Sequence, residues 1–480
     1  MPFSLHPFGA NPGKKEETMD PACSGRRNAD QEGVDRKKHH TRRRVRFGIV
    51  VAASVCAFLV TAQSATAVDI SFRSFSKAAA IGPPADQYAE KLLSISTTVL
   101  GESGQVKFIK VSPTPAVPET FKKSVVAAVA AGGPLAGGAG FDAAYVSGST
   151  LNPAWGFLYN SGVPFGPNFD EFIGFLYGKS INNGKASGLD QLQEILDENG
   201  KNIVAVPIVG SSHQGSGYFM QPVGNAGSTA GIGLAGLCQQ DWTFRYLPPA
   251  QYVLDRACEN LVAAGKIPKK NIKFIKAIAG GGSLVKAVTD GKLQAFEFAT
   301  PLDDVSSLFG LPEGNPGTVG TRYLHYPGWH QPFLITYMII NKNVWNKLSP
   351  AQQALVLSVG RDHVISSYGE NLRQQGAKLK EILTANDGDK NAGTDLVMVQ
   401  WPESDLALLR DATIQFLNAR ASDAELSEQD RKDYGRILES LRMYVSSNNG
   451  YWKVREVPNA LRFQNWHDPG GKKGWDQNLK

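Results

Sequence analysis

The chain has 480 residues, of which 42% are hydrophobic and 20% charged, so it is long enough for two or three globular domains with a sizeable core. The formal net charge is +6, but the first 67 residues hold eleven of the 50 Lys and Arg residues and six of the 44 Asp and Glu residues. The remainder is close to neutral. A nucleic-acid-binding protein keeps its basic residues in the folded domain, so nucleic acid is not an expected partner.

The first 67 residues have the order of features found in a secretory signal. Residues 1–46 are polar and basic, residues 47–60 are mostly apolar, and Ala65-Thr66-Ala67 fits a cleavage pattern with small residues. A membrane-spanning helix needs about 20 apolar residues, so an uncleaved membrane anchor is the less favoured alternative. We therefore expect export with cleavage near Ala67.

Strand-like and helix-like segments alternate in the first part of the remaining chain. Apolar runs or alternating apolar and polar residues predict strands over 68–72, 106–111 and 141–146. Helices are predicted over 84–93 and 120–131. This alternation indicates an α/β protein with mainly parallel strands.

The later part of the chain is predicted to be largely helical. Ser349, Pro350 and Gln352 form a helix start, with a capping residue, a first-turn proline and the partner of a capping box. Apolar spacing predicts an unusually long helix from there to about residue 383, which its glycines should weaken or bend.

Ser427 and Asp430 mark the start of another predicted helix near the C-terminus. It carries an apolar stripe at helical spacing: Tyr434, Ile437, Leu438, Leu441 and Tyr444. We interpret the stripe as a packing surface that can meet a neighbouring chain, so a homodimer through the C-terminal helices is one expectation.

Two further sequence features resemble parts of chemical sites. Gly231 to Gly236 match the GxGxxG pattern of dinucleotide-binding loops, but that reading needs a preceding strand, and a loop rich in Gly, Asn and Ser precedes it here. We expect a flexible loop at the edge of a lobe and no cofactor. Cys238 and Cys258 are the cysteines outside the leader; an exported chain can pair them, and the sequence leaves this open.

Polar residues at the ends of predicted strands are the candidate binding residues. Gln214 follows an apolar run, Arg245 lies among apolar and aromatic residues, and Glu297 ends a short apolar run. Open α/β sheets bind ligands beyond the carboxyl ends of their strands. A half-buried guanidinium needs an anion beside it and can hold a carboxylate through two hydrogen bonds. Arg245 is therefore predicted to bind an organic anion, with an internal ion pair to Glu297 as the alternative.

Residues 140–385 resemble the extracytoplasmic solute receptors of TRAP (tripartite ATP-independent periplasmic) transporters, most closely the branch that binds 2-oxo acids. The resemblance rests on short stretches in a shared order: Val163-Pro164-Phe165-Gly166, Glu171-Phe172, Gln214-Gly215-Ser216-Gly217, Phe244-Arg245, Ala295-Phe296-Glu297-Phe298, Tyr326-Pro327-Gly328-Trp329, Asn341-Lys342, and Leu348-Ser349-Pro350-Ala351-Gln352.

The resemblance implies a two-lobed α/β fold of the periplasmic-binding-protein type (type II), with a long helix crossing both lobes. One lobe is expected from 68–210 plus about 325–370. The other is expected from about 211–324 plus 371–455, including the C-terminal helices, followed by a tail over 456–480.

The resemblance also implies the site. Arg245 would hold the ligand carboxylate, and Tyr326 and Trp329 would wall the pocket, although such an aromatic pair is equally often core. Gln214, Glu297 and the backbone carbonyl of Phe298 would hold a sodium or calcium ion, which prefers oxygen ligands.

The resulting expectation is a solute-binding protein that closes its lobes on a small organic acid and delivers it to TRAP membrane subunits, without being an enzyme. One alternative is an exported enzyme acting on a carboxylate, with Glu297 as base and His213 or His325 as acid. Another is a receptor that passes its ligand to a signalling protein.

Overall fold

The structure, a computed structural model, describes residues 66–74, 82–110, 119–131, 141–224, 231–275, 282–304, 323–384 and 397–455. The predictions for the basic leader, the cleavage pattern up to Ala65 and the tail over 456–480 lie outside these residues. Within them, no helix combines the length and apolarity that a bilayer crossing requires.

Five strands form the first sheet, in the order β2-β1-β3-β10-β4. Their bounds are β1 (Val68–Ser74), β2 (Val106–Lys110), β3 (Ala143–Ser147), β4 (Ile203–Ser211) and β10 (Leu334–Asn341). β1 runs parallel to β2 and β3, as the sequence predicts, whereas β10 is antiparallel to β3 and β4. The register of β10 shifts opposite Pro207, which has no N–H group to donate to a neighbouring strand.

Helices cover this sheet and supply its core. They are α2 (Gly82–Leu100), α3 (Glu119–Ala131), α4 (Gly156–Asn160), α5 (Phe169–Tyr177), α6 (Gly188–Glu198) and α11 (Lys342–Trp345), with 3-10 turns over Glu102–Gly104 and Gly148–Thr150. The strand β4 is buried along its whole length. Its alternate residues therefore contribute to two different apolar clusters, for example Val206 to one and Ala205 to the other.

The second sheet has the order β11-β9-β5-β8-β6-β7. Its strands are β5 (Gly217–Phe219), β6 (Thr243–Arg245), β7 (Lys273–Phe274), β8 (Ala295–Phe296), β9 (Tyr323–Tyr326) and β11 (Val397–Gln400). The accompanying helices are α7 (Gly233–Gln239), α8 (Pro248–Ala263), α9 (Gly282–Thr289), α10 (Pro301–Asp304), α13 (Glu403–Ala421) and α14 (Glu428–Arg455).

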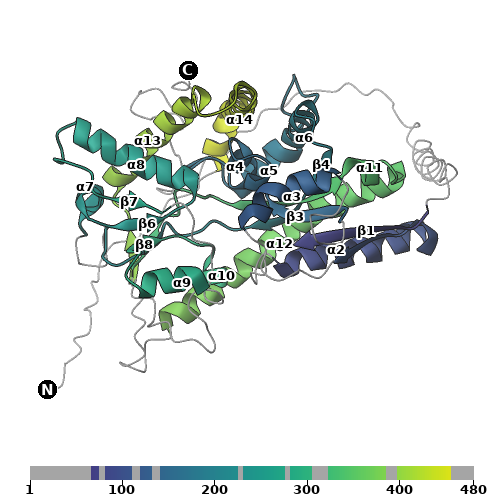
Figure 1. Cartoon of the computed structure of the whole chain (residues 1–480), viewed down its shortest axis with the longest axis horizontal. Coiled ribbons are helices and arrows are strands. Elements are labelled where there is room, and N and C mark those ends of the chain that lie inside the picture. Colours follow the sequence, from purple (N-terminus) through teal and green to yellow (C-terminus); the bar gives the residue numbers. More distant parts are fainter. Residues whose placement is uncertain are drawn as a thin grey trace, which may run out of the picture. The chain divides into compact units, whose positions relative to one another are not determined.

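The long helix α12 (Pro350–Thr384) is continuous over 35 residues and contacts both β4 and α10 (Figure 1). The predicted capping box is present, because the Ser349 N–H donates to Oε1 of Gln352 at 2.8 Å. Gly360 does not interrupt the helix. A Cβ atom there would lie 2.9 Å from the Pro207 carbonyl oxygen, so glycine allows the helix to approach β4 closely.

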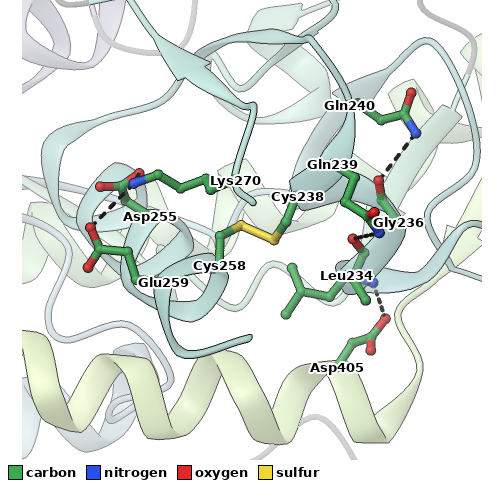
Figure 2. Close-up of a disulfide and its surroundings, with 11 residues drawn as sticks. Leu234, Gly236, Cys238, Gln239, Gln240, Asp255, Cys258, Glu259, Lys270 and Asp405 are labelled. Atoms are coloured by element: carbon green, nitrogen blue, oxygen red, sulfur yellow. Dashed lines mark hydrogen bonds and ion pairs between the residues drawn. A yellow bond between two sulfur atoms is a disulfide. The ribbon is translucent and has the colours of Figure 1, made fainter. Parts of the chain in front are cut away.

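The glycine-rich motif at 231–236 is helical from Gly233 onward, contrary to the sequence expectation of a loop, and only Gly231 and Ile232 lie outside the helix. The helix α7 begins at Gly233, and Oδ2 of Asp405 accepts a hydrogen bond of 2.8 Å from the Leu234 N–H (Figure 2). A carboxylate from α13 therefore occupies the helix N-terminus, the place that a phosphate takes in dinucleotide-binding loops. Cys238 at the other end of α7 forms a disulfide with Cys258 of α8.

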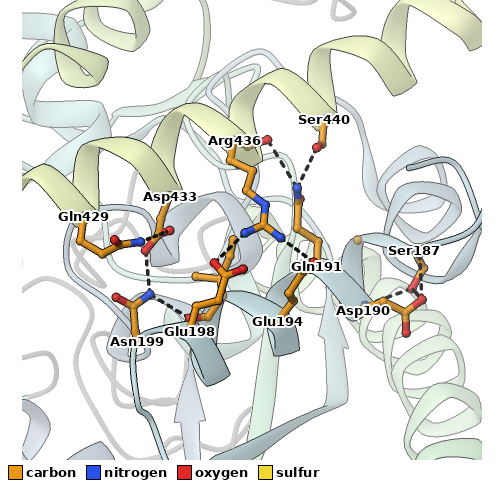
Figure 3. Close-up of polar contacts among 12 residues, drawn as sticks. Ser187, Asp190, Gln191, Glu194, Glu198, Asn199, Gln429, Asp433, Arg436 and Ser440 are labelled. Carbon is orange, nitrogen blue, oxygen red and sulfur yellow. Dashed lines mark hydrogen bonds and ion pairs between the residues drawn. The ribbon is translucent and has the colours of Figure 1, made fainter. Parts of the chain in front are cut away.

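The apolar stripe of α14 is packed within its own chain, so the idea that it meets a neighbouring chain is wrong. Tyr434, Ile437 and Leu441 are at most 1% exposed, and the hydroxyl of Tyr444 donates to the Glu171 carbonyl oxygen. Polar contacts hold the same helix on α6 (Figure 3). Arg436 reaches both Glu194 and Glu198. A homodimer would have to use other surfaces.

Candidate functional site

Two short chain segments lead directly from a strand of one sheet to a strand of the other, and both carry predicted site residues. Residues 212–216 lead from β4 to β5, and residues 327–333 lead from β9 to β10. The Ser216 N–H donates to the His325 carbonyl oxygen at 2.7 Å. A Cβ atom on Gly328 would lie 1.6 Å from the Gln214 carbonyl oxygen, so only glycine fits at position 328. Gln214 therefore lies directly against the segment that carries Trp329.

Arg245 and Glu297 lie at the ends of the neighbouring parallel strands β6 and β8. Nη1 of Arg245 donates to Oε1 of Glu297 at 2.7 Å and to the Glu297 carbonyl oxygen at 2.5 Å. The two side chains are 14% and 1% exposed. The internal ion pair that the sequence analysis gave as the alternative is therefore formed, and anion binding by Arg245 stays a prediction.

The Glu297 carboxylate is only partly satisfied by its neighbours. Oε1 accepts from Arg245 and from the Leu247 N–H at 2.8 Å, whereas Oε2 is buried without a hydrogen-bond partner. Burial raises the pKa of Glu297 above its usual range, and the Arg245 charge and the Leu247 N–H oppose that rise. A cation beside Oε2 would stabilise the charged form.

Gln214 has the same kind of unsatisfied oxygen. Its side chain is 5% exposed, and Oε1 is buried without a hydrogen-bond partner. Buried acceptors of this kind are uncommon and call for an explanation. Gln214 and Glu297, which each have one such oxygen, are the two residues that the resemblance predicts as side-chain ligands of a cation.

A small cavity of about 10 Å³ lies beside the Glu297 carboxylate. Gly215, Gly217, Glu297 and Phe298 are among its lining residues, and the volume is about that of one water-sized sphere. Among the described residues, no group of three or more His, Cys, Asp and Glu side chains is placed to hold a metal. The lining residues offer a cation the Glu297 carboxylate and backbone oxygens, which are ligands that sodium and calcium accept. Gln214 is not among the residues that line this cavity, so its amide as a ligand stays a prediction.

The aromatic candidates have different surroundings. The Phe298 ring is partly buried, and its centroid lies 6.0 Å from the Arg245 guanidinium carbon. Trp329 is 3% exposed and stacks on Phe165 at a centroid distance of 5.7 Å, as a core residue does. Tyr326 is partly buried, and its carbonyl oxygen accepts from the Trp401 N–H at 2.9 Å. Their contact with a ligand stays a prediction.

Sequence reasoning missed two residues near the site. Asp304 is 2% exposed, accepts from the Tyr218 hydroxyl at 2.7 Å and lines the small cavity beside Glu297. His330 follows Trp329 and stacks on Tyr246 at 5.8 Å. Burial, with a smaller contribution from the Arg245 charge, lowers its pKa to about 3. The sequence feature that could have revealed His330 is a titratable residue within an otherwise largely aromatic and apolar stretch.

Comparison with solved structures gives three instructive likenesses. A TRAP transporter solute-binding protein from Bordetella bronchiseptica RB50, with copurified calcium and picolinate, has a TM-score of 0.58 and 16% identity over 81% of this chain and 95% of its own. A TRAP solute-binding protein from Pseudoalteromonas atlantica T6c, with sodium and pyruvate, has a TM-score of 0.58 and 15% identity over 81% and 97%. A Bordetella pertussis receptor that binds pyroglutamic acid has a TM-score of 0.51 and 14% identity over 78% and 99%.

The chain has the fold of TRAP solute-binding proteins. The predicted two-lobed α/β class is thereby confirmed. No protein-family model matches the sequence, and the comparison with curated proteins finds no match. Because all three sequence identities are low, the likeness establishes the fold of this chain alone. The ligands of these receptors do not establish what this chain binds.

Proposed function

We propose that the chain is a periplasmic solute-binding protein that captures a small organic acid together with a cation and delivers it to TRAP membrane subunits. The observation that carries this proposal is the buried, unsatisfied Oε2 of Glu297, on the carboxylate whose other oxygen pairs with the Arg245 guanidinium. Oε1 of Gln214, the other predicted side-chain ligand, is also buried without a hydrogen-bond partner. The fold-related receptors that hold calcium with picolinate or sodium with pyruvate support it.

The cation would be held by Gln214 Oε1, Glu297 Oε2 and the backbone carbonyl of Phe298. When bound, the cation would supply positive charge at the buried Glu297 carboxylate. Arg245 and Glu297 together are neutral, so they offer an incoming carboxylate little net attraction. A sodium or calcium ion at Glu297 would make the group cationic, and Arg245 could then hold the ligand carboxylate through charge-assisted hydrogen bonds.

Lobe closure would complete the capture. We propose that residues 68–210 with about 325–370 form one lobe, and that about 211–324 with 371–455 form the other. The segments 212–216 and 327–333 would then be the hinge, with Tyr326 and Trp329 at the pocket wall. Closure expels water and strengthens the polar contacts, so binding energy is spent on the closed shape that the membrane subunits recognise.

We infer that the chain is not an enzyme. His325 is fully buried, and its Nε2 accepts a hydrogen bond of 2.9 Å from the Val223 N–H, so Nδ1 carries the proton and faces the Tyr323 carbonyl oxygen at 3.1 Å. Burial lowers its pKa to about 3. Such a histidine is a poor proton donor at neutral pH. The other candidate acid, His213, is exposed.

A thermal-shift screen tests the proposal. Small carboxylates, including 2-oxo acids, are tested against the purified protein with sodium, with calcium and with neither. We expect acid-dependent stabilisation that grows when a cation is present, because a ligand that binds the native state shifts the unfolding equilibrium. Disappearance of the acid during incubation would instead support the enzyme alternative. Stabilisation that is independent of both cations would remove the cation from the proposal.

A further inference from the structure

A second, larger cavity of about 210 Å³ lies among α4, α8, α13 and the segment that contains His330. One wall is aromatic. Phe157 and Phe416 lie 6.0 Å apart by ring centroids, and Tyr252 stacks on Phe416 at 5.6 Å with planes 11° apart. Pro248 and Ala250 add further apolar surface to the lining. A flat apolar group has a matching surface here.

Two other lining residues carry polar atoms that lack partners. Both ring nitrogens of His330 and Oε1 of Gln331 are buried without a hydrogen-bond partner. The two side chains are 4% and 2% exposed. A neutral histidine has one N–H donor and one acceptor nitrogen, so the two side chains together carry one donor and two acceptors that have no partner within the protein. Unpaired buried polar groups are costly, and an occupant that bonds to them would recover that cost.

The charge and size of the cavity narrow the chemistry of its occupant. Among the described lining residues only Arg420 is charged, and it donates to Oδ2 of Asp423 at 2.9 Å. The lining is therefore close to neutral. An apolar cavity of about 150 Å³ is large enough for benzene, so this one is large enough for a single substituted ring. We propose that it binds one aromatic ring bearing an uncharged hydroxyl-type group, with that group on His330 and Gln331.

The ring could belong to a separate small molecule or to the organic acid itself. Leu247 lines this cavity and donates its N–H to Glu297, and His330 stacks on Tyr246, the residue after Arg245. The cavity therefore adjoins the ion pair through two contacts. The recognition chemistry is the same from either source, and the inference does not require the proposed transport function.

Phenol is the first probe, measured by calorimetry on the purified full chain without acid and without added cation. Fluorobenzene is the matched probe, because it has similar size but no hydroxyl group. We expect phenol to bind and fluorobenzene to bind about tenfold more weakly, as expected for losing hydrogen bonds to buried partners. No phenol binding at millimolar concentration, or equal affinity for both probes, would overturn the inference.

Variants test the polar end directly. His330→Phe preserves an aromatic ring beside Tyr246, and Gln331→Leu preserves much of the side-chain volume; each should weaken phenol binding about tenfold and leave fluorobenzene unchanged. Gln374→Leu makes the same substitution at a partly buried residue of α12 outside the lining and should change neither. Unchanged phenol affinity in both cavity variants would contradict the proposal even if the wild type binds phenol.

A final comparison distinguishes the two sources of the ring. A phenyl-bearing 2-oxo acid is measured beside the methyl-bearing acid. If the ring belongs to the acid, the phenyl acid binds more tightly and competes with phenol. If the occupant is a separate molecule, phenol and the methyl acid bind together. Failure of every acid to bind, with phenol still bound, would reject the transport proposal and keep this one.

Discussion

Nη1 of Arg245 lies 2.7 Å from Oε1 of Glu297, while the other oxygen of that carboxylate, Oε2, is buried without a hydrogen-bond partner. The carboxylate therefore neutralises the guanidinium and still has one oxygen to offer. This arrangement couples the two parts of the proposed site, because a cation on Oε2 would return positive charge to the place where an anion is expected. The first three predictions test this coupling.

Replacement of Arg245 should remove anion binding. Arg245→Lys keeps the positive charge but cannot form two parallel hydrogen bonds to a carboxylate, and Arg245→Ala also leaves Glu297 buried and unpaired. We expect Arg245→Ala to cost about 2–5 kcal/mol of acid-binding free energy, with a smaller loss for lysine. Titration calorimetry measures both. Arg436→Ala, which breaks contacts between α14 and α6, is the control and should bind acid normally.

Glu297→Gln should remove the dependence of acid binding on the cation. The variant keeps the side-chain shape but loses the negative charge that attracts sodium or calcium, and Arg245 keeps its charge. We expect similar acid affinity with and without cation in the variant, against a change of about tenfold or more in the wild type, which corresponds to about 1.4 kcal/mol. Glu198→Gln, at a more exposed carboxylate, should behave as wild type.

The stability of the cation-free protein should depend on the pKa of Glu297. Burial raises that pKa above its usual value near 4.5, so the folded state holds the proton more tightly than the unfolded state. This contribution to stability is fully present below that value and is lost as pH rises through the folded-state pKa. Urea unfolding at several pH values should show this loss in the wild type relative to Glu297→Gln. A difference that grows in the opposite direction would contradict the assignment.

The disulfide should stabilise the part of the chain around α7 and α8. Cys238 and Cys258 are 20 residues apart, and closing a loop of that length restricts the unfolded chain by about 3 kcal/mol. We expect a Cys238→Ala/Cys258→Ala double variant to have an unfolding free energy lower by about 3 kcal/mol and therefore to unfold at a lower urea concentration. Adding reductant should lower the midpoint of the wild type and leave the double variant unchanged. A bridge of this kind also suits an exported protein.

The intramolecular packing of α14 can be tested with two residues on different faces of the same helix. Leu441 is fully buried, and Met443 is 57% exposed. Leu441→Ala should cost about 2–5 kcal/mol of unfolding free energy, whereas Met443→Ala should change it by no more than about 0.5 kcal/mol. Equal, small effects would mean that α14 does not pack on the rest of its chain in solution.

Local sequence signals predicted many of the secondary elements. The predicted strand over 68–72 is part of β1, and the predicted helix over 120–131 is nearly all of α3. The predicted helix start at Ser427 and Asp430 is also confirmed, because the Asp430 N–H donates to the Ser427 hydroxyl at 3.0 Å. The prediction for 231–236 was wrong because the decisive contact comes from Asp405, 171 residues from Leu234.

The sequence by itself determined the α/β class, the unusually long helix and the presence of a half-buried arginine among apolar residues, because these follow from periodicity, caps and the cost of burying charge over a few neighbouring positions. Only the tertiary structure decided that Arg245 is paired, that oxygens of Gln214 and Glu297 lack partners, that Cys238 meets Cys258, and that a second cavity adjoins the site. Arg245 and Glu297 are 52 residues apart, and they meet because the register of β6 and β8 brings them together. Such contacts depend on how whole elements pack, which short-range preferences do not encode.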